Sequence, residues 1–404
     1  MLSHLQALPS DPLLGLIQQY SQDPNPNKID LGVGVYKNEN GDTPVLDCVK
    51  AAEKQLLEIE ASKSYVGPLG NQGFNQQMLA LILGESSQSI SDERVAVMQT
   101  PGGCGALRIA GELISRANRL RSESEKASKI WVSDPTWVNH IPLLGDAGVQ
   151  IQTYPYYDGE KKAIKFDEML SALSRAETGD IILLHACCHN PSGADLAPDQ
   201  WQAITQLCQK NGLIPFIDMA YQGFAQGLEQ DAFGLRLLAE QLPEAIVAVS
   251  CSKNFGLYRE RVGLIAIIAP SKAAAEIATS NMMNISRGIY SMPPSHGASL
   301  VNIILADKAL KAQWGEELDA MRERIQGLRA KVVSEMVGMG YGDYFSFIEK
   351  ENGMFSFLGV SPEQVNELIH KHSIYLAGSG RINLAGLNER NVQRFCKAVV
   401  SVLS

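Results

Sequence analysis

Short apolar segments alternate with amphipathic helical stretches along the middle of the chain, and each apolar segment ends abruptly in polar or glycine residues. The segments are Arg94–Gln99, Ile130–Val132, Ile181–Leu184, Leu213–Ile217 and Ala245–Val249. This alternation predicts an α/β fold with a mostly parallel sheet. Ligands of such sheets bind beyond the carboxyl ends of the strands. Five residues that follow these strands are therefore expected to share one site: Gly103, Trp137, Asn190, Asp218 and Lys253.

The composition is that of a globular protein that acts on small molecules. The chain has 404 residues, of which 45% are hydrophobic and 20% are charged. Its net charge of −9 argues against nucleic-acid binding, which favours a basic surface. No apolar run approaches the roughly 20 residues of a membrane span, and Met1–Ser10 lacks the features of a secretory signal. Seven cysteines without a C-x-x-C motif predict a reduced, cytoplasmic protein.

Two domains are expected from the order of the predicted elements. The first forty residues are rich in Pro, Gly and Asn and indicate a loose arm, and the α/β alternation begins near Pro44 and ends near Lys311. A long helix follows, and the tail adds predicted helices at Ser361–His372 and Glu389–Leu403. We therefore expect a large domain over residues 44–311 and a smaller domain built from 1–43 and 312–404.

Lys253 ends a predicted core strand, and its position is unusual for a charged side chain. Burial lowers the pKa of a lysine, and a neutral lysine attacks carbonyl groups to form Schiff bases. The alternative is a lysine whose ammonium group reaches solvent along the strand end. Asp218 ends another strand, where its carboxylate could pair with a cationic ring nitrogen, or alternatively serve as a helix cap or in an ion pair. Tyr221 could bind the same ligand.

An anion site is predicted where Gly102–Gly105 precede a helix expected from Ala106 to about Arg121. Free backbone N–H groups at the start of a helix bind anions. Ser250, Ser252 and Arg261 could add hydrogen-bond donors and a bidentate cation for a phosphate group. The alternative is a glycine turn without a ligand. The chain lacks the G-x-x-x-x-G-K-[ST] sequence of a nucleotide-binding P-loop.

Histidine, cysteine and arginine residues offer further candidates. His185, Cys187 and His189 alternate along a predicted strand and could face one way, as metal ligands do. No carboxylate or further cysteine completes the set nearby, so we expect buried thiols and a histidine behind the site, and no metal. Arg287 and Arg381 each lie next to a glycine and suit bidentate binding of a carboxylate, although either alone could be a surface arginine.

Five motifs, in this order, resemble those of the aspartate/aromatic aminotransferases, class I enzymes of fold type I that use pyridoxal 5′-phosphate (PLP). The motifs are Ser133-Asp134-Pro135-x-Trp137-x-Asn139-His140, Cys187-Cys188-His189-Asn190-Pro191-Ser192-Gly193, Asp218-x-Ala220-Tyr221-Gln222-Gly223-Phe224, Ser250-x-Ser252-Lys253-Asn254-Phe255-Gly256-Leu257-Tyr258-x-Glu260-Arg261-Val262-Gly263 and Asn352-Gly353-Met354-Phe355-Ser356. The resemblance runs from about Asp11 to the C-terminus. It implies the PLP-dependent transferase fold, with a mostly parallel seven-stranded sheet in the large domain, a smaller α/β domain, and a homodimer with shared active sites.

The resemblance also implies a role for each site residue. Lys253, Asp218 and Tyr221 would be catalytic: Lys253 would bind PLP covalently and move the substrate proton, and Asp218, supported by His140, would pair with the pyridinium nitrogen. Further contacts to PLP would come from Gly103, Cys104, Trp137, Asn190, Tyr221, Ser250, Ser252, Arg261 and Tyr65 of the partner subunit. The substrate would be bound by Gly34, Trp137, Asn190, Phe355, Arg381 and Arg287 of the partner subunit, with the arginines on its carboxylates.

Two positions depart from the family pattern and bear on substrate preference. Cys104 stands where relatives usually have Thr or Ser, and Met292 where aspartate-selective relatives tend to have Asn, whereas Val35 and Lys37 match the aspartate branch. We expect a ping-pong aminotransferase of amino-acid metabolism that takes aromatic amino acids, and also aspartate and glutamate, with 2-oxoglutarate as acceptor. The alternative is an aspartate aminotransferase. The paired arginines suit exchange between substrates with two carboxylates and therefore argue against a PLP-dependent lyase or decarboxylase. A non-catalytic regulator would need an appended DNA-binding segment, and none is visible in the sequence.

Overall fold

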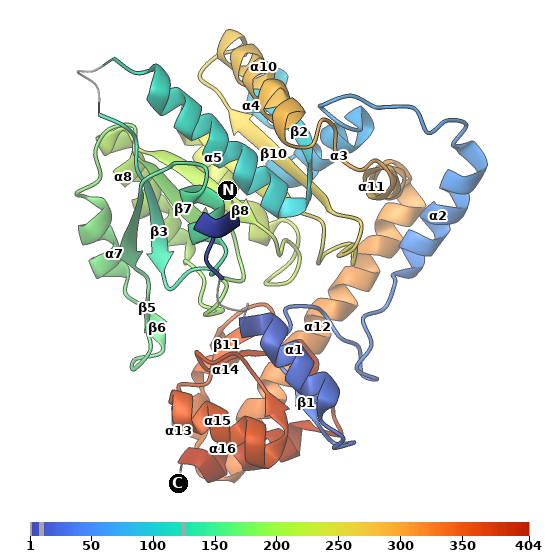
Figure 1. Ribbon diagram of the computed structural model, residues 1–404, viewed down its shortest axis with the longest axis vertical. Helices are drawn as coiled ribbons and strands as arrows, with labels where there is room; N and C mark the ends of the chain where they lie inside the picture. The colour runs from blue at the N-terminus through green and yellow to red at the C-terminus, as the bar shows by residue number, and fades with distance from the viewer. Residues whose placement is uncertain (1, 8–11, 123–125, 404) are drawn as a thin grey trace. The chain divides into compact units, whose positions relative to one another are not determined.

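The computed structural model describes residues 2–7, 12–122 and 126–403 and divides into two compact units (Figure 1). The larger unit is Pro44–Glu323, and the smaller unit joins the residues up to Thr43 with those from Arg324 onward. One long helix, α12 (Lys308–Gly338), contributes residues to both units. The second boundary expected from the sequence, at residue 311, lies near the start of this helix.

A seven-stranded sheet forms the centre of the larger unit, in the order β2-β10-β9-β8-β7-β3-β4. Its strands are β2 (Val95–Pro101), β3 (Ile130–Asp134), β4 (Ile151–Pro155), β7 (Ile181–His185), β8 (Ile214–Met219), β9 (Ala245–Ser250) and β10 (Val262–Ile268). Only β10 runs against its neighbours, β2 and β9, while the other pairs are parallel. The mostly parallel α/β sheet predicted from the sequence is thus confirmed. Because β10 is reversed, its first residues lie at the edge where the parallel strands have their carboxyl ends.

Burial on both faces explains why these strands are continuous apolar runs rather than alternating ones. Every residue of β9 is buried. Helix α5 packs on β9 and β10, and α10 packs on β2. The side chains of Met98, Val132, Phe216, Ala248 and Ile265 belong to one hydrophobic cluster that also includes residues of α5 and α10, so these helices and the sheet pack together.

The remaining elements of the larger unit lie before, between and after the strands of the sheet. The helices are α2 (Asp47–Ile59), α3 (Gln72–Leu83), α4 (Gln88–Ser91), α5 (Gly102–Leu120), α6 (His140–Gly145), α7 (Phe166–Leu173), α8 (Pro198–Asn211), the 3₁₀ turn η2 (Gln230–Ala232), α9 (Phe233–Gln241), α10 (Lys272–Ile289) and α11 (His296–Ala306), and β5 (Tyr157–Asp158) pairs with β6 (Ala163–Ile164). Ser271 caps α10 by accepting a hydrogen bond from the Ala274 N–H at 3.2 Å. Helix α8 ends at Gly212, whose φ of 65° suits glycine.

The smaller unit is assembled from both ends of the chain. Its elements are η1 (Leu2–His4), α1 (Pro12–Gln22), β1 (Ile29–Asp30), the second part of α12, α13 (Gly342–Phe345), α14 (Phe347–Lys350), β11 (Phe355–Phe357), α15 (Pro362–His372), β12 (Ile374–Tyr375), β13 (Arg381–Asn383), η3 (Leu384–Gly386) and α16 (Val392–Leu403). Strand β1 pairs with β12 in parallel, and β11 pairs with β13 antiparallel. The two predicted helices of the tail are present as α15 and α16.

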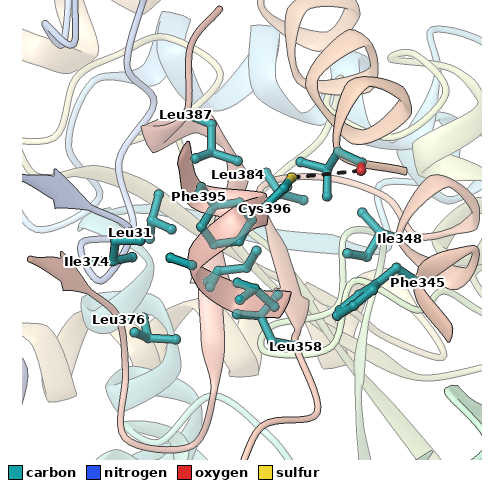
Figure 2. Packing of buried hydrophobic residues seen from close by; sticks show 14 of the residues in the cluster. Leu31, Phe345, Ile348, Leu358, Ile374, Leu376, Leu384, Leu387, Phe395 and Cys396 are labelled. Carbon is teal, nitrogen blue, oxygen red and sulfur yellow. Dashed lines mark hydrogen bonds between the residues drawn. The ribbon is translucent and has the colours of Figure 1, made fainter. Parts of the chain in front are cut away.

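A second hydrophobic core holds the smaller unit together. Figure 2 shows Leu31 from the N-terminal arm among side chains from the C-terminal part, including Ile348, Leu384 and Phe395. Helix α15 starts with a reciprocal cap, in which the Ser361 hydroxyl accepts from the Gln364 N–H and the Gln364 side chain accepts from the Ser361 N–H. This core is independent of the one beneath the seven-stranded sheet, in line with the division into two units.

None of the helices in the described part of the chain has both the length and the apolar character needed to cross a membrane. All seven cysteines are free thiols, and Cys104 is the one that is not buried.

Candidate active site

The start of α5 lies at the end of β2, where Gly102 and Gly103 come close to Arg261 and Ser250, and we call this group of residues the phosphate cup. Gly102 has a φ of +70°, and a Cβ atom there would lie 2.4 Å from Nη2 of Arg261. A Cβ atom on Gly103 would lie 3.1 Å from Cβ of Ser250. The absence of side chains therefore lets the first turn of α5 approach Arg261 and Ser250 closely. The helix starts at Gly102 and not at Ala106 as predicted, so Cys104 lies within its first turn.

The connection from β9 to β10 brings two cations to the same edge. Lys253 is the third residue after β9, and Arg261 immediately precedes β10. Arg261 has a φ of 54°, a left-handed conformation that non-glycine residues seldom adopt, and its Nη1 donates to the Tyr258 carbonyl at 3.2 Å. Ser252 donates its N–H to the Ser250 hydroxyl. The guanidinium, the two hydroxyl residues and the start of α5 together suit a dianionic phosphate group.

The Lys253 ammonium lies in an unfavourable environment for a positive charge. Burial lowers the pKa of Lys253, and the carboxylate of Asp218 opposes this effect without cancelling it. Nζ lies 4.7 Å from the centre of the Tyr221 ring, whose side chain is buried. A lysine with a lowered pKa has more of the neutral, nucleophilic amine at neutral pH.

Asp218 is hydrogen-bonded to a buried histidine. Nε2 of His140 lies 2.9 Å from Oδ2 of Asp218, and Nδ1 of His140 lies 2.8 Å from the Thr136 hydroxyl. Burial raises the pKa of Asp218, but the hydrogen bond and the electrostatic interaction with His140, together with a smaller contribution from Lys253, outweigh it, so the net pKa is below the usual value. The carboxylate is therefore ionised at neutral pH and can hold a proton on a basic ring nitrogen.

A row of aromatic rings lies behind this carboxylate. The ring centres of Tyr156 and His189 are 4.0 Å apart, those of His189 and His185 are 4.3 Å apart, and His185, His140 and Trp137 continue the row through edge-to-face contacts at 5.2 and 5.3 Å. Burial lowers the pKa of His185 to about 3, so this ring is neutral. Its Nδ1 accepts a hydrogen bond from the Asn190 N–H at 3.1 Å, which places Asn190 beside the row.

The alternating set His185, Cys187 and His189 does not gather as metal ligands. His185 and His189 stack face to face instead. Among the described residues, the group whose ligand atoms come within 4.8 Å of one another is His140, His185 and Asp218. Since His140 and Asp218 are already hydrogen-bonded to each other, we interpret this group as part of the carboxylate's support.

A separate cluster in the smaller unit surrounds Arg381. Its guanidinium carbon lies 4.5 Å from the centre of the Phe355 ring, a cation–π contact, and its Nη2 donates to the Gly32 carbonyl at 2.7 Å. A Cβ atom on Gly34 would lie 3.1 Å from Cζ of Phe355. Three residues predicted to bind substrate, Gly34, Phe355 and Arg381, are therefore in mutual contact through the phenylalanine ring.

Two predicted site residues lie apart from these clusters. Tyr65 is 93% exposed. Arg287, near the end of α10, is exposed, and its guanidinium donates a hydrogen bond to the Ser291 hydroxyl. The family resemblance implies that both residues belong to the site of a partner subunit, and that assignment remains a prediction.

Thr136 and the contact between His185 and Asn190 were missed by the sequence analysis. Thr136 lies four residues before His140 in the turn that leads into α6, and this spacing could have indicated the hydrogen bond. His185 was expected only as a histidine behind the site. Its partner Asn190 lies across a turn whose path follows from the fold and not from residue types.

The fold and this site define a PLP-dependent transferase. The residues fit PLP because the larger unit offers a phosphate cup beside Arg261, an amine of lowered pKa in Lys253 for its aldehyde, and an ionised Asp218 for its ring nitrogen.

Comparisons with known proteins agree, and the chain belongs to the aminotransferase class I and II family, whose model matches residues 26–399. It is 45% identical to the aspartate aminotransferase of Escherichia coli (strain K12) over 403 residues, 100% of both chains. It is 44% identical to the aromatic-amino-acid aminotransferase of Pseudomonas aeruginosa, covering 98% of this chain and 97% of that one. The aromatic-amino-acid aminotransferase structure from Burkholderia pseudomallei, covalently bound to pyridoxal phosphate, superposes with a TM-score of 0.96 at 39% identity and 100% coverage of both chains. The protein is thus a PLP-dependent transaminase of fold type I.

Proposed function

We propose that this enzyme transfers the amino group of aromatic amino acids, and also of aspartate and glutamate, to 2-oxoglutarate. The observation that carries the proposal is the state of Arg287, which is exposed and forms no ion pair with any residue in the described part of the chain. Such a guanidinium is available to a distal carboxylate but can also turn away when an uncharged ring enters. Met292, five residues later, adds an apolar surface in place of a polar one. The chain's similarity to both an aspartate aminotransferase and an aromatic-amino-acid aminotransferase supports the proposed double substrate range.

The proposal assigns the chemistry to the PLP-binding domain, residues 44–311. When bound, PLP supplies an electron sink for the electrons left on the substrate Cα. Nζ of Lys253 takes the Cα proton and returns it, because its lowered pKa keeps part of the amine neutral. Asp218, fixed by His140, holds a proton on the ring nitrogen. The remaining assignments are Gly103, Cys104, Ser250, Ser252 and Arg261 to the phosphate, Trp137 to the ring face, and Asn190 and Tyr221 to the phenolic oxygen.

The two arginines divide the recognition of carboxylates between them. Arg381 binds the α-carboxylate, which every substrate carries, and Arg287 binds the distal carboxylate of aspartate, glutamate and 2-oxoglutarate. An arginine left unpaired in a dry pocket would be costly, so Arg287 must move to solvent or find another partner when a ring occupies the pocket. This difference between the two arginines makes the proposal testable.

The test compares Arg287→Leu with Arg381→Leu, using aspartate and phenylalanine as amino donors. Arg287→Leu removes a charge-assisted pair worth about 1.5–3 kcal/mol, so kcat/KM for aspartate falls by roughly one to two decades while that for phenylalanine is retained. Arg381→Leu lowers kcat/KM for both donors. Equal losses for both donors in Arg287→Leu would show that Arg287 is structural or binds the α-carboxylate, and the assignment would be wrong.

The second candidate is a dedicated aspartate aminotransferase, favoured by the 45% identity to the Escherichia coli enzyme and by Val35 and Lys37. Steady-state kinetics with tyrosine, phenylalanine, tryptophan and aspartate, each with 2-oxoglutarate, separate the two. Aromatic donors with kcat/KM values comparable to that of aspartate support the broad enzyme. Negligible turnover of all three aromatic donors supports the dedicated one.

We further propose a cytoplasmic homodimer with shared active sites. Apolar side chains are exposed on α2 and α10 of the larger unit, among them Leu57, Ile59, Ile277 and Ile289, and large exposed apolar groups often mark protein contacts. Tyr65, which is exposed and lies six residues after the end of α2, is assigned to the phosphate site of the partner subunit. Seven free thiols favour a reducing compartment. Sedimentation of the active enzyme tests the dimer, and a fully active monomer would contradict it.

A further inference from the structure

Arg329, on the part of α12 that belongs to the smaller unit, is a buried cation with an unusually large number of hydrogen bonds. Arg329 is 2% exposed. The guanidinium donates to the carbonyl oxygens of Ile348 at 2.7 Å, Asn352 at 3.0 Å, Gly353 at 2.8 and 3.1 Å and Phe355 at 2.7 Å, and to the Ser356 hydroxyl at 2.9 Å. All three nitrogens are used, and every one of these acceptors lies between residues 348 and 356. A guanidinium has five N–H groups, so the hydrogen-bond donors of this arginine are all directed to one segment of chain.

The positive charge of Arg329 is compensated inside the same segment. Glu351 is 5% exposed, and its Oε2 lies 3.8 Å from Nη1 of Arg329. The same oxygen accepts a hydrogen bond from the Ser356 hydroxyl at 2.5 Å. A buried ion pair is tolerated only when its remaining donors and acceptors are satisfied, and here the backbone carbonyls satisfy them. Lysine, with three donors on a flexible stem, could not replace this planar fork.

The segment held by Arg329 carries the phenylalanine that supports Arg381. Phe355 starts β11, which pairs with β13 so that Phe355 lies opposite Asn383 and Phe357 lies opposite Arg381. The Phe355 ring lies against the Arg381 guanidinium on one side and closely approaches Gly34 on another. At its other end the segment is anchored by the side chain of Ile348 in the core of the smaller unit (Figure 2). A change in the backbone at Phe355 would therefore move the ring on which the Arg381 guanidinium lies.

We propose that Arg329 is a positioning residue for substrate carboxylate binding, acting through Phe355 on the orientation of Arg381. This inference rests on the proposed role of Arg381 in binding the α-carboxylate. Arg329 itself touches no substrate, because its donors are already taken. Since all substrates carry the α-carboxylate, loss of Arg329 weakens the binding of every amino donor and every 2-oxo acid acceptor alike.

The experiment compares Arg329→Lys with the matched control Arg324→Lys. Arg324 lies on the same helix and in the same unit, but its Nη2 donates to the Leu387 carbonyl at 2.8 Å and pairs with Glu39, outside the 348–356 segment. The measurements are kcat and KM for aspartate and phenylalanine, the Kd of 3-phenylpropionate and of PLP by calorimetry, and Tm. A misplacement of about 1 Å in a binding group costs up to about a hundredfold, so we expect Arg329→Lys to raise KM and the Kd of 3-phenylpropionate by roughly ten- to a hundredfold.

The control and the PLP affinity distinguish positioning from general damage. Arg324→Lys lowers Tm and changes the Kd of 3-phenylpropionate by about twofold or less, and neither variant changes the Kd of PLP, whose proposed contacts lie in the larger unit. Acting through Phe355 also predicts non-additivity: in a Phe355→Leu background, Arg329→Lys adds little further loss. Independent losses that multiply in the double variant would overturn the proposal.

The outcome also separates this inference from the proposed function. If Arg381→Leu leaves 3-phenylpropionate binding unchanged, the role of Arg381 is wrong and the inference falls with it. If Arg381→Leu abolishes binding but folded Arg329→Lys retains the wild-type Kd, only the positioning role is overturned. Should Arg329→Lys fail to fold, Ser356→Ala decides, because it removes one neutral hydrogen bond of the network: about a threefold rise in Kd supports the proposal, and an unchanged Kd overturns it.

Discussion

Lys253 shows how a single residue combines a cost in stability with a chemical use. Burial lowers its pKa, and the nearby Asp218 carboxylate restores only part of the charge stabilisation. The folded protein without cofactor therefore favours the neutral amine relative to the unfolded chain. Active sites commonly retain such locally unfavourable groups because function requires them.

Lys253→Met should lower the rate of transamination by at least about 10²- to 10⁴-fold, the loss expected for a missing proton carrier alone. The same substitution should stabilise the cofactor-free protein at pH 7. Below the lowered pKa the lysine is charged in both states, so folding carries the full cost of burying the charge. As the pH rises through the lowered pKa toward the usual 10.5, that cost disappears. The Tm advantage of Lys253→Met should therefore narrow as the pH is raised, in thermal melts from pH 7 to 10.

Lys272→Met is the matched control for this measurement. Lys272 is exposed and paired with Glu93, which raises its pKa instead of lowering it. The control should show no stabilisation at pH 7. A Tm difference for Lys253→Met that stays constant with pH would contradict the origin proposed for it.

At the scale of elements, the site depends on how closely β10 approaches the start of α5. A Cβ atom on Gly263 in β10 would lie 2.3 Å from the carbonyl carbon of Gly102 and 2.7 Å from the Val249 oxygen. All of these are backbone atoms, so no side chain can turn aside to make room. The glycine thus sets the spacing between the strand and the helix start that forms the phosphate cup.

Gly263→Ala should weaken PLP binding by tenfold or more, on the order of the loss expected when a binding group is displaced by about 1 Å. The measurement is titration of the cofactor-free protein with PLP, together with Tm. Gly315→Ala is the control, because nothing lies within 4 Å of a Cβ atom there and the residue is helical. This control should bind PLP normally and gain up to about 1 kcal/mol in stability. Normal PLP affinity in Gly263→Ala would show that the cup tolerates a shift of β10.

The strands and their polar ends were predictable because each strand of a sheet that is buried on both faces is a continuous apolar run in the sequence. The start of α5 was not, because glycine disfavours helix interiors, and Gly102 and Gly103 lie there only because Arg261 and Ser250 approach from distant parts of the chain. The contact between Asn190 and His185 was hidden for the same reason: it follows from a turn and not from residue type.

The whole molecule consists of two units with separate cores, and the boundary inside α12 was hard to predict because the helix is continuous across it. The family resemblance supplied what neither composition nor spacing contains, namely the roles of Arg287 and Tyr65. Both residues are exposed in the single chain. Their functions can be tested only in the assembly.

Mixed dimers of Lys253→Ala and Arg287→Leu should recover aspartate transamination if sites are shared. In a mixed dimer, the intact Lys253 of one subunit meets the intact Arg287 of the other, so one site of the two is complete. Random exchange at equal amounts then restores roughly one quarter of the wild-type activity for an obligate two-fold dimer. The measurement is aspartate turnover after co-refolding, with each variant alone as control. No recovery above the separate variants would place Arg287 in its own subunit's site or exclude a shared site.

The reversed direction of β10 has a consequence for how this enzyme can change over generations. Parallel neighbours need a crossover connection, usually through a helix, whereas β9 and β10 are antiparallel and are joined at one edge of the sheet by residues 251–261, which contain no helix. Lys253 and Arg261, assigned to opposite ends of the same cofactor, are therefore inherited as one compact piece of sequence. An insertion or deletion there disturbs both at once, which makes the stretch intolerant of length change while the helices around it remain free to drift.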